Sequence, residues 1–478
     1  MAWPPTEPVA RSPEARLAPA TTRFGARYDV TVVGLAAGAA GVGLLATVAP
    51  VPALALTALL VLAALMAADL AVGVCVFIVA TFFEALPALA GLPVSVGKLA
   101  GTALLVSWVA VVVARRREEE SFLSAHAGLA WLLLAFLAWV FASLAWAQDT
   151  GAVAVSLSRY APNLLLIPIL FTALRNRRAA LAVAIAFVAA AAAAAAYGIV
   201  ETPAPDLSNE PVRIVGSVGD SNELAAVLVA AIPLAAALAV MARGRPGLRA
   251  LAVAAGACCG AGTVLTLSRG GLVALGGIAV AAILLAGRRR RAGATILAVA
   301  AVLGAVVYFG ALASPAARDR VINPGSGTGR SDLWTIALRM TSADPVFGVG
   351  SGNFPVTSVH FLLRPGVIQR DDFVIGQPRV AHNIFLGFLA ELGVVGLALF
   401  CAILVACIGC AVAAARRFAR ARDGPMELLA RASLVGLIGL LVASVFLSDQ
   451  YGQQLWLLLG LGPGLLRIGR HEAEAGAT

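Results

Sequence analysis

Arginine side chains stand in short turns between apolar segments, where their chemistry points to an anion. Arg269 lies in Leu267-Ser-Arg-Gly-Gly271, at the expected outer boundary of a membrane. An arginine at the centre of a membrane helix costs about 2.5 to 3.5 kcal/mol, and less near the interface, so this guanidinium needs a partner. Its paired donors match the oxygens of a phosphate or a carboxylate. The turn therefore predicts either a ligand anion or a structural salt bridge.

A second arginine opens the string Arg213-Ile-Val-Gly-Ser-Val-Gly-Asp-Ser-Asn-Glu223, which precedes another apolar segment. Gly216 and Gly219 permit tight backbone turns. Asp220, Asn222 or the serine between them has the short polar side chain that caps a helix. The string favours a helix start that carries either an anion ligand or an ordinary loop arginine.

A histidine and an asparagine, His382 and Asn383, end a long polar loop and precede the apolar residues Ile384-Phe385-Leu386. The ordinary pKa of an imidazole, near 6.5, suits proton transfer close to neutral pH. A histidine at a helix start is also a common cap or hydrogen-bonding residue. The residues alone leave both interpretations open.

The elements that must position these side chains are membrane helices. Of 478 residues, 60% are hydrophobic and 13% are charged, with a mean hydropathy of +0.92. This composition excludes a soluble globule and predicts an all-α, polytopic transmembrane helical bundle. Since a span needs about 20 apolar residues, we expect about 14 spans, within a range of 12 to 14. They fall at 30–48, 52–69, 71–90, 98–114, 125–146, 158–174, 179–200, 223–242, 249–266, 271–286, 293–313, 383–412, 427–447 and 454–466.

The net charge of +10 follows the topology of these spans. Clusters of arginine alternate between loops as the positive-inside rule requires, so the charge does not indicate nucleic acid. Both termini are expected in the cytoplasm, and the first apolar segment is expected to stay as an uncleaved helix. The clusters are residues 11–27, 115–117, 175–178, 243–249, 288–291, 416–422 and 467–470.

The loops divide the chain into four predicted regions. Residues 1–29 form a cytoplasmic tail, 30–200 the N-terminal helices, 201–412 a region with two long outer loops, and 413–478 the C-terminal helices with a cytoplasmic tail. The larger of these outer loops, 314–381, is expected to contain short helices at the membrane surface, one of them over 331–340.

Two further patterns have ordinary explanations. Asp69 and Glu84 lie near span ends, which favours solvated carboxylates over intramembrane function. All six cysteines lie in apolar segments, so no extracellular disulfides are expected. The Cys407-x-x-Cys410 spacing has neither a second pair nor a nearby histidine in the sequence, which favours helix packing over metal binding.

Five short motifs in order resemble the O-antigen ligase and polymerase family over about residues 200 to 400. They are Arg213-x-x-Gly-x-x-Gly-Asp-Ser-Asn222, Thr266-x-Ser-Arg-Gly270, Gly329-Arg-x-x-x-Trp334, Pro345-x-x-Gly-x-Gly350, and Ala381-His-Asn-x-x-Leu386 with Glu391-x-Gly393. The first motif has Ser221 where relatives often have proline, so its turn geometry is expected to differ.

The resemblance implies a bacterial inner-membrane glycosyltransferase with its active site on the periplasmic side. It implies a glycan donor linked to a polyprenyl (undecaprenyl) diphosphate, a lipid or glycan acceptor, contact with membrane lipids, no cofactor and no metal.

The resemblance also implies roles for particular residues. His382 is the expected base. Arg269, Arg330 and Arg213 are the expected diphosphate ligands. Asn383, Asn222 and Asp220 are expected in supporting positions.

Several alternatives stay open at this point. His360 is a second loop histidine that would be the base if His382 only caps its helix, and Asp371 with Asp372 would bind the acceptor. The motifs do not separate a ligase from a polymerase that joins carrier-linked repeat units. A transporter with many spans is a more distant alternative, although no inverted repeat is evident in the sequence. Oligomeric state is not predicted.

Overall fold

The architecture comes from a computed structural model, which describes residues 61–89, 94–114, 120–201, 213–286, 329–362 and 379–475, with isolated positions elsewhere. Backbone contacts divide the chain into residues 1–61 and 62–478, and every helix below belongs to the second unit. The predicted spans at 30–48 and 293–313, and most of 52–69, lie outside the described residues.

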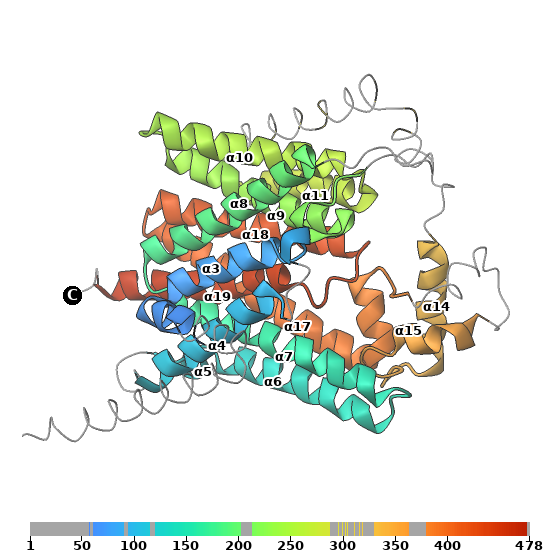
Figure 1. Cartoon of the computed structure of the whole chain (residues 1–478). Helices are drawn as coiled ribbons and strands as arrows, with labels where there is room; N and C mark the ends of the chain where they lie inside the picture. Colours follow the sequence, from blue (N-terminus) through green and yellow to red (C-terminus); the bar gives the residue numbers. More distant parts are fainter. Residues whose placement is uncertain are drawn as a thin grey trace, which may run out of the picture. The chain divides into compact units, whose positions relative to one another are not determined.

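All regular structure in the described ranges is helical, as the composition predicts (Figure 1). The long helices are α3 (Leu70–Phe82), α4 (Val96–Ala114), α6 (Ala127–Ala142), α7 (Thr150–Ala173), α8 (Arg177–Val200), α9 (Ser221–Met241), α10 (Pro246–Leu265), α11 (Arg269–Leu285), α14 (Arg330–Ala343), α17 (Ile384–Arg420), α18 (Gly424–Ser444) and α19 (Gln453–Ala475). Short helical pieces are η1 (Pro87–Leu89), α5 (Phe122–Ala125), η2 (Ser143–Ala145), η3 (Gly216–Val218), α15 (Phe354–Thr357) and η5 (Ser358–Phe361).

Within the described ranges, 8 helices are long and apolar enough to cross a membrane, and α3 and α11 are shorter apolar helices. Each predicted span from 71 to 286, and each one after 383, overlaps a described helix, although α3 ends at Phe82 and so is shorter than the predicted span 71–90. The multi-pass membrane character of the protein is therefore confirmed. The figure of about 14 spans remains a prediction, since a span needs about 20 apolar residues and part of the chain is not described.

Several helices extend beyond their apolar stretch, because caps decide helix ends and hydropathy does not. α7 begins at Thr150, and not near 158 as predicted. The cap is Asp149, whose side chain accepts a hydrogen bond from the Ala152 amide at 3.1 Å. α17 continues to Arg420, where basic side chains in the last turn complement the helix dipole. Asp69 is also a cap, since it accepts from the Ala71 amide at 2.9 Å and begins α3.

Helices α9 and α18 form the centre of the bundle. In each helix, 67% of the most apolar 18-residue stretch is buried. The two helices pack on one another, and between them they contact α10, α11, α17 and α19. Gly436 in α18 lets the two helix backbones approach each other closely, because a methyl group there would lie 2.5 Å from the Ala230 carbonyl oxygen in α9. Small residues at such contacts let membrane helices pack backbone to backbone.

Two ion pairs show that several arginine clusters share one end of the bundle, here called the arginine-rich end. Arg177 at the start of α8 pairs with Asp423 before α18 at 3.1 Å, and Arg470 in α19 pairs with Glu120 ahead of α6 at 3.8 Å. The turns 213–220 and 266–269 and the segment 379–383 lie at the other ends of these helices, here called the site end. Figure 1 shows α14 and α15 at that end, away from the labelled C-terminus.

Candidate functional site

The turn before α9 fixes the first group of candidate residues. Gly216 and Gly219 have φ values of 57° and 90°, which glycine adopts without strain. A side chain at Gly216 would also meet the Ala194 carbonyl oxygen at 2.7 Å. Asp220 then caps α9 by accepting hydrogen bonds from the Asn222 and Glu223 amides, at 2.7 and 3.0 Å. The turn holds Arg213 and Asn222 beside each other.

Arg213 belongs to a hydrogen-bond network that joins the α9 turn to the α10–α11 turn. Its Nε donates to the Thr266 carbonyl oxygen at 2.8 Å, and its Nη2 donates to Asn222 Oδ1 at 3.2 Å. The Ser268 hydroxyl donates to the same Asn222 oxygen at 2.9 Å. We call Arg213, Asn222, Thr266 and Ser268 the Arg213 network. Asn222 is its shared acceptor, a role that sequence reasoning did not assign.

The α10–α11 turn presents Arg269 as the first residue of α11. Ser268 caps that helix by accepting from the Gly271 amide at 3.2 Å, and Leu267 has a φ of 49°. A branched or bulky residue with positive φ is strained, and such strain clusters at functional sites. Ser268 belongs to the Arg213 network. Arg269, the next residue in the chain, is therefore held beside that network.

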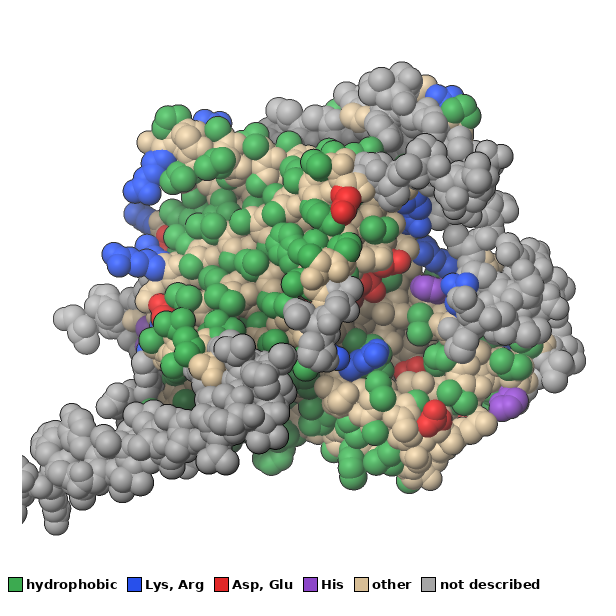
Figure 2. Space-filling view, in the orientation of Figure 1, with side chains coloured by type: hydrophobic (Ala, Val, Ile, Leu, Met, Phe, Trp, Pro, Cys, Tyr) green, Lys and Arg blue, Asp and Glu red, His purple; other side chains and the backbone are tan. Residues whose placement is uncertain are grey.

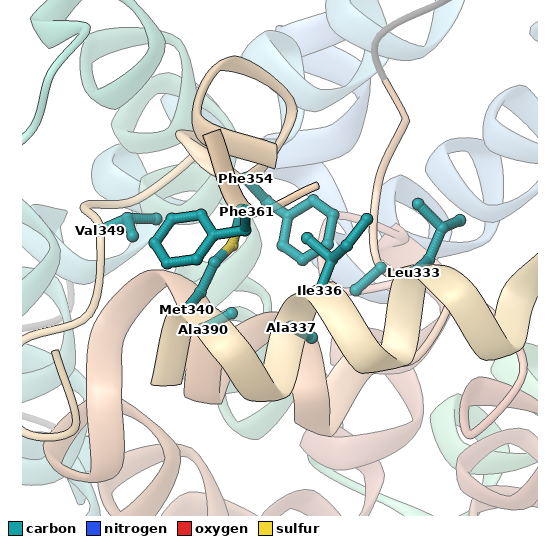
Figure 3. Close-up of a cluster of buried hydrophobic side chains, with 9 residues drawn as sticks. Leu333, Ile336, Ala337, Met340, Val349, Phe354, Phe361 and Ala390 are labelled. Atoms are coloured by element: carbon teal, nitrogen blue, oxygen red, sulfur yellow. The ribbon is translucent and has the colours of Figure 1, made fainter. Parts of the chain in front are cut away.

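Helix α14 carries Arg330 at its N-terminus and is anchored by a buried apolar cluster. Leu333, Ile336 and Met340 project from α14 toward Phe354 and Phe361 (Figure 3). Gly329 begins the helix with a φ of 61°. The predicted helix over 331–340 is thus present and is one turn longer in total.

A second contact brings the starts of α14 and α11 toward one another. The rings of Trp334 and Phe446 have centroids 6.1 Å apart. A methyl group on Gly270 would lie 3.0 Å from Phe446 Cβ, so the glycine lets this aromatic residue pack beside Arg269. Phe446 therefore lies between the helix that begins with Arg269 and the helix that begins with Arg330.

A kink in α17 anchors the other end of this loop. Gly393 has a φ of 66°, and a side chain there would collide with the Val346 carbonyl oxygen. The Glu391 carboxylate accepts from the amides of Gly352 and Phe354, at 2.9 and 3.2 Å. These residues match the family motif Glu391-x-Gly393, and their geometry gives them a structural role in holding the loop on α17.

His382 lies among charged groups from three segments. Burial lowers the pKa of its imidazole, the charges of Arg330 and Arg379 lower it further, and the charge of Asp220 opposes them. We call His382, Arg330, Arg379 and Asp220 the His382 cluster. An imidazole in this setting is neutral near pH 7 and is able to accept a proton.

The backbone at His382 is also unusual. Its φ is 48°, and its buried Nδ1 has no hydrogen-bond partner among the described residues. Asn383 beside it caps α17 by accepting from the Phe385 and Leu386 amides, at 2.9 and 3.0 Å. Asn383 is therefore the residue that caps α17, and the helix start does not require His382 as a cap.

The His382 cluster and the Arg213 network meet at the α9 N-terminus, because Asp220 acts on His382 and caps the helix that holds Asn222. Figure 2 shows basic, acidic and histidine side chains gathered at the site end, away from the basic side chains at the arginine-rich end. Sequence reasoning missed Arg379 as a member, although it stands three residues before His382 in the same loop.

Asp449 is a second residue that sequence reasoning missed. It lies between α18 and α19 with 9% of its surface exposed. Burial and the neighbouring Glu223 raise the pKa of this carboxyl to about 8, so it is largely protonated at neutral pH. The polar run Ser448-Asp-Gln450 between two apolar helices was the available signal.

The other candidate site residues do not belong to the His382 cluster. His360 is exposed and lines a separate cleft, and it is not among the groups that shift His382. Asp371 and Asp372 lie outside the described residues. The His126 ring reaches within 3.9 Å of Cys410 Sγ, a proximity that the sequence did not suggest. Even so, no three His, Cys, Asp or Glu side chains in the described ranges are grouped to hold a metal ion.

Apolar helices of spanning length, with arginines and a histidine collected at one end, define a multi-pass membrane protein with a candidate anion site. Residues 254–401 match the family model described as O-antigen ligase. This match over part of the chain confirms the resemblance to the O-antigen ligase family seen in its motifs. No curated protein matches the chain.

The family implies an enzyme of glycan transfer that acts on lipid-linked glycans. The matched segment includes Arg269, Arg330, His382 and Asn383, whereas Arg213, Asp220 and Asn222 precede it.

Proposed function

We propose that this protein transfers a glycan from a polyprenyl (undecaprenyl) diphosphate carrier to an acceptor hydroxyl on the periplasmic side of a bacterial inner membrane. The observation that carries the proposal is the His382 cluster, in which a half-buried imidazole has a pKa lowered by burial and by the charge of the Arg330 guanidinium. This arrangement pairs a proton acceptor with a cation suited to diphosphate.

In the proposed reaction, the acceptor oxygen attacks the anomeric carbon of the glycan and gives its proton to His382. The bond from that carbon to the diphosphate oxygen breaks, and polyprenyl diphosphate leaves with the bonding electron pair. Arg330 and Arg269 stabilise the charge that develops on the leaving oxygens, because fixed donors in a poorly hydrated site need little reorganisation. Arg213 holds the diphosphate with them.

The proposal includes the four regions predicted from the sequence, with 201–412 as the catalytic region and 314–381 as its periplasmic loop. Both termini are proposed to be cytoplasmic. The two ion pairs at the arginine-rich end support this orientation, because the positive-inside rule assigns such clusters to the cytoplasm. No cofactor or metal is included in the proposed mechanism.

Loss of activity in single variants tests the proposal. In a strain that lacks the gene, His382→Ala and Arg269→Ala are each expected to abolish attachment or extension of surface glycan while the protein remains in the membrane. His471→Ala and Arg249→Ala make the same chemical changes at exposed positions of the arginine-rich end and are expected to restore the glycan. Normal glycan from both site variants would refute the proposal.

A polymerase that joins carrier-linked repeat units is the second candidate within this chemistry, since the donor step is the same. The deletion strain separates the two. Loss of all attached polymer supports the ligase, and attachment of a single repeat supports the polymerase.

Transport is the alternative of a different class. Uptake of substrate by vesicles that lack a polyprenyl donor, together with no glycan transfer when the donor is supplied, would favour a transporter.

A further inference from the structure

A cleft of about 520 Å³ lies at the site end, between the α6–α7 connection and the loop that follows α14. Trp146 and Gln148 line it from the first of these, and Asp344, Phe347 and His360 line it from the second. Its lining among the described residues contains neither arginine nor lysine, so its chemistry differs from that of the His382 cluster. We call it the Trp146 cleft.

Aromatic rings form one wall of the Trp146 cleft. The Phe347 ring stacks on Trp139 at 5.6 Å with an interplanar angle of 19°, and it meets Trp146 edge to face at 5.2 Å. Phe347 is nevertheless 51% exposed. Trp139 is fixed from behind, since its Nε1 donates to the Leu392 carbonyl oxygen at 2.9 Å. The wall is an exposed ring on a rigid support.

Polar groups accompany this wall. Gln148, Asp344 and His360 are exposed around the cleft, and the buried Nε1 of Trp146 has no hydrogen-bond partner among the described residues. Gln148, Asp344 and His360 present an amide, a carboxylate and an imidazole to a ligand in the cleft.

The two walls are tied to one another, so the cleft is a formed feature of the fold. Asn353 accepts from the Asp149 amide at 2.7 Å and donates to the Asp149 carbonyl oxygen at 3.0 Å. The Ser351 amide donates to the Ser143 hydroxyl at 3.2 Å. Gly350 permits the approach, because a methyl group there would lie 2.5 Å from Ala147 Cβ.

The chemistry of the Trp146 cleft fits a sugar ring. A sugar presents C–H groups on its faces, which pack on aromatic rings, and hydroxyls at its edge, which hydrogen-bond to amide, carboxylate and imidazole groups. A phosphate would meet Asp344 with no arginine or lysine in the described lining to offset the repulsion. An acyl chain would leave the polar groups unpaired.

The position of the cleft relative to Arg330 indicates which sugar of the glycan could occupy it. Asp344 directly follows α14, and Arg330 is the first residue of that 14-residue helix. At 1.5 Å per residue, α14 separates them by about 20 Å. A saccharide in the cleft is therefore remote from a diphosphate held at Arg330.

We propose that the Trp146 cleft binds a saccharide unit of the glycan substrate at a distance from the bond that is transferred. The inference rests on the proposed function for the identity of the substrate. Its ligand is a sugar of the donor glycan or of the acceptor, and the two are distinguished by the experiment.

The test uses purified full-length protein in lipid nanodiscs and oligosaccharides cut from the surface glycan of its own bacterium. Phe347→Ala is expected to weaken oligosaccharide binding by about 3- to 10-fold, the effect of losing one aromatic contact. Asp344→Asn, an exposed isosteric change, is expected to weaken it in the same direction. Phe141→Ala is the matched control, since Phe141 is 62% exposed and does not line the cleft.

Transfer assays then identify the substrate that occupies the cleft. If the donor glycan binds there, Phe347→Ala raises KM for donors of several repeat units and leaves kcat with a single-repeat donor unchanged. If the acceptor binds there, the same variant raises KM for the acceptor at every donor length. Either result supports the inference.

Unchanged oligosaccharide affinity in both Phe347→Ala and Asp344→Asn would overturn the inference, whatever the transfer activity. Binding is measured without turnover, so this failure is separate from failure of the proposed function. The latter would appear as full transfer activity in His382→Ala.

Discussion

Asn222 offers a sharp test of the candidate site, because a single oxygen joins its two turns. Oδ1 accepts from Arg213 Nη2 at 3.2 Å and from the Ser268 hydroxyl at 2.9 Å. Asn222→Ala removes both bonds. Of the hydrogen bonds in the Arg213 network, Arg213 keeps the one from Nε to the Thr266 carbonyl oxygen at 2.8 Å, which fixes one edge of the guanidinium.

The size of the effect follows from these bonds. A hydrogen bond to a charged group contributes about 1.5 to 3 kcal/mol, and a neutral one about 0.5 to 1.5 kcal/mol. Since the Thr266 contact survives, we expect a loss of about 2 kcal/mol in transition-state stabilisation. At 1.36 kcal/mol per factor of ten, kcat/KM should fall about 30-fold.

The assay measures initial rates of glycan transfer at low concentrations of polyprenyl-diphosphate-linked donor, with thermal unfolding of the same preparation. Asn176→Ala is the matched control. Asn176 caps α8 at the arginine-rich end by accepting from the Ala179 amide at 2.9 Å. It should lose about 1 kcal/mol of stability, as a lost cap does, with no change in kcat/KM.

A double-mutant cycle with Arg213→Ala decides whether Asn222 acts through the arginine. Positioning predicts that the double variant is little worse than Arg213→Ala alone. A loss of less than threefold in Asn222→Ala, or effects of the two changes that multiply fully, would refute the reasoning.

Three further outcomes are expected. The rate of glycan transfer should fall as the pH drops and His382 becomes protonated. Arg379→Ala should raise the pKa of His382 and move this limb of the pH–rate profile to higher pH. Asp220→Asn should lower that pKa and move the limb to lower pH. An unchanged midpoint in both variants would show that His382 does not control the limb. Gly393→Ala should cost about 1 to 3 kcal/mol or more through its positive φ, measured as a lower unfolding temperature, and a fully stable variant would contradict the kink geometry. Glu391→Gln keeps one oxygen as an acceptor and replaces the other with an NH2 donor that cannot accept from a backbone amide. It should cost about 1 to 3 kcal/mol of unfolding free energy, and wild-type stability would contradict the assigned role.

The sequence by itself determined the all-helical membrane class, because continuous apolar runs of about 20 residues match the length of a membrane helix, whose backbone hydrogen bonds are all made within the segment. It also predicted the positions of the described spans and the helix that follows Arg330. It could not give helix ends such as Thr150 or Arg420, because these depend on caps and charge after the apolar stretch has finished.

The resemblance to the O-antigen ligase family also followed from sequence, since five short motifs occur in order along the chain. Sequence could not separate motif residues that hold the fold from those that face a substrate. Glu391 and Gly393 match the motif as well as His382 does, yet their contacts serve the kink of α17. That distinction depends on which groups each side chain meets.

Tertiary structure alone brought residues distant in the chain into one site. Asn222 meets Ser268 because α9 and the α10–α11 turn pack together, and Asp220 acts on His382 because the 379–383 segment returns to the start of α9. The lowered pKa of the imidazole and the aromatic wall at Trp146 arise from the same cause. Burial and neighbouring charge are properties of packing, and no local pattern of residues specifies them.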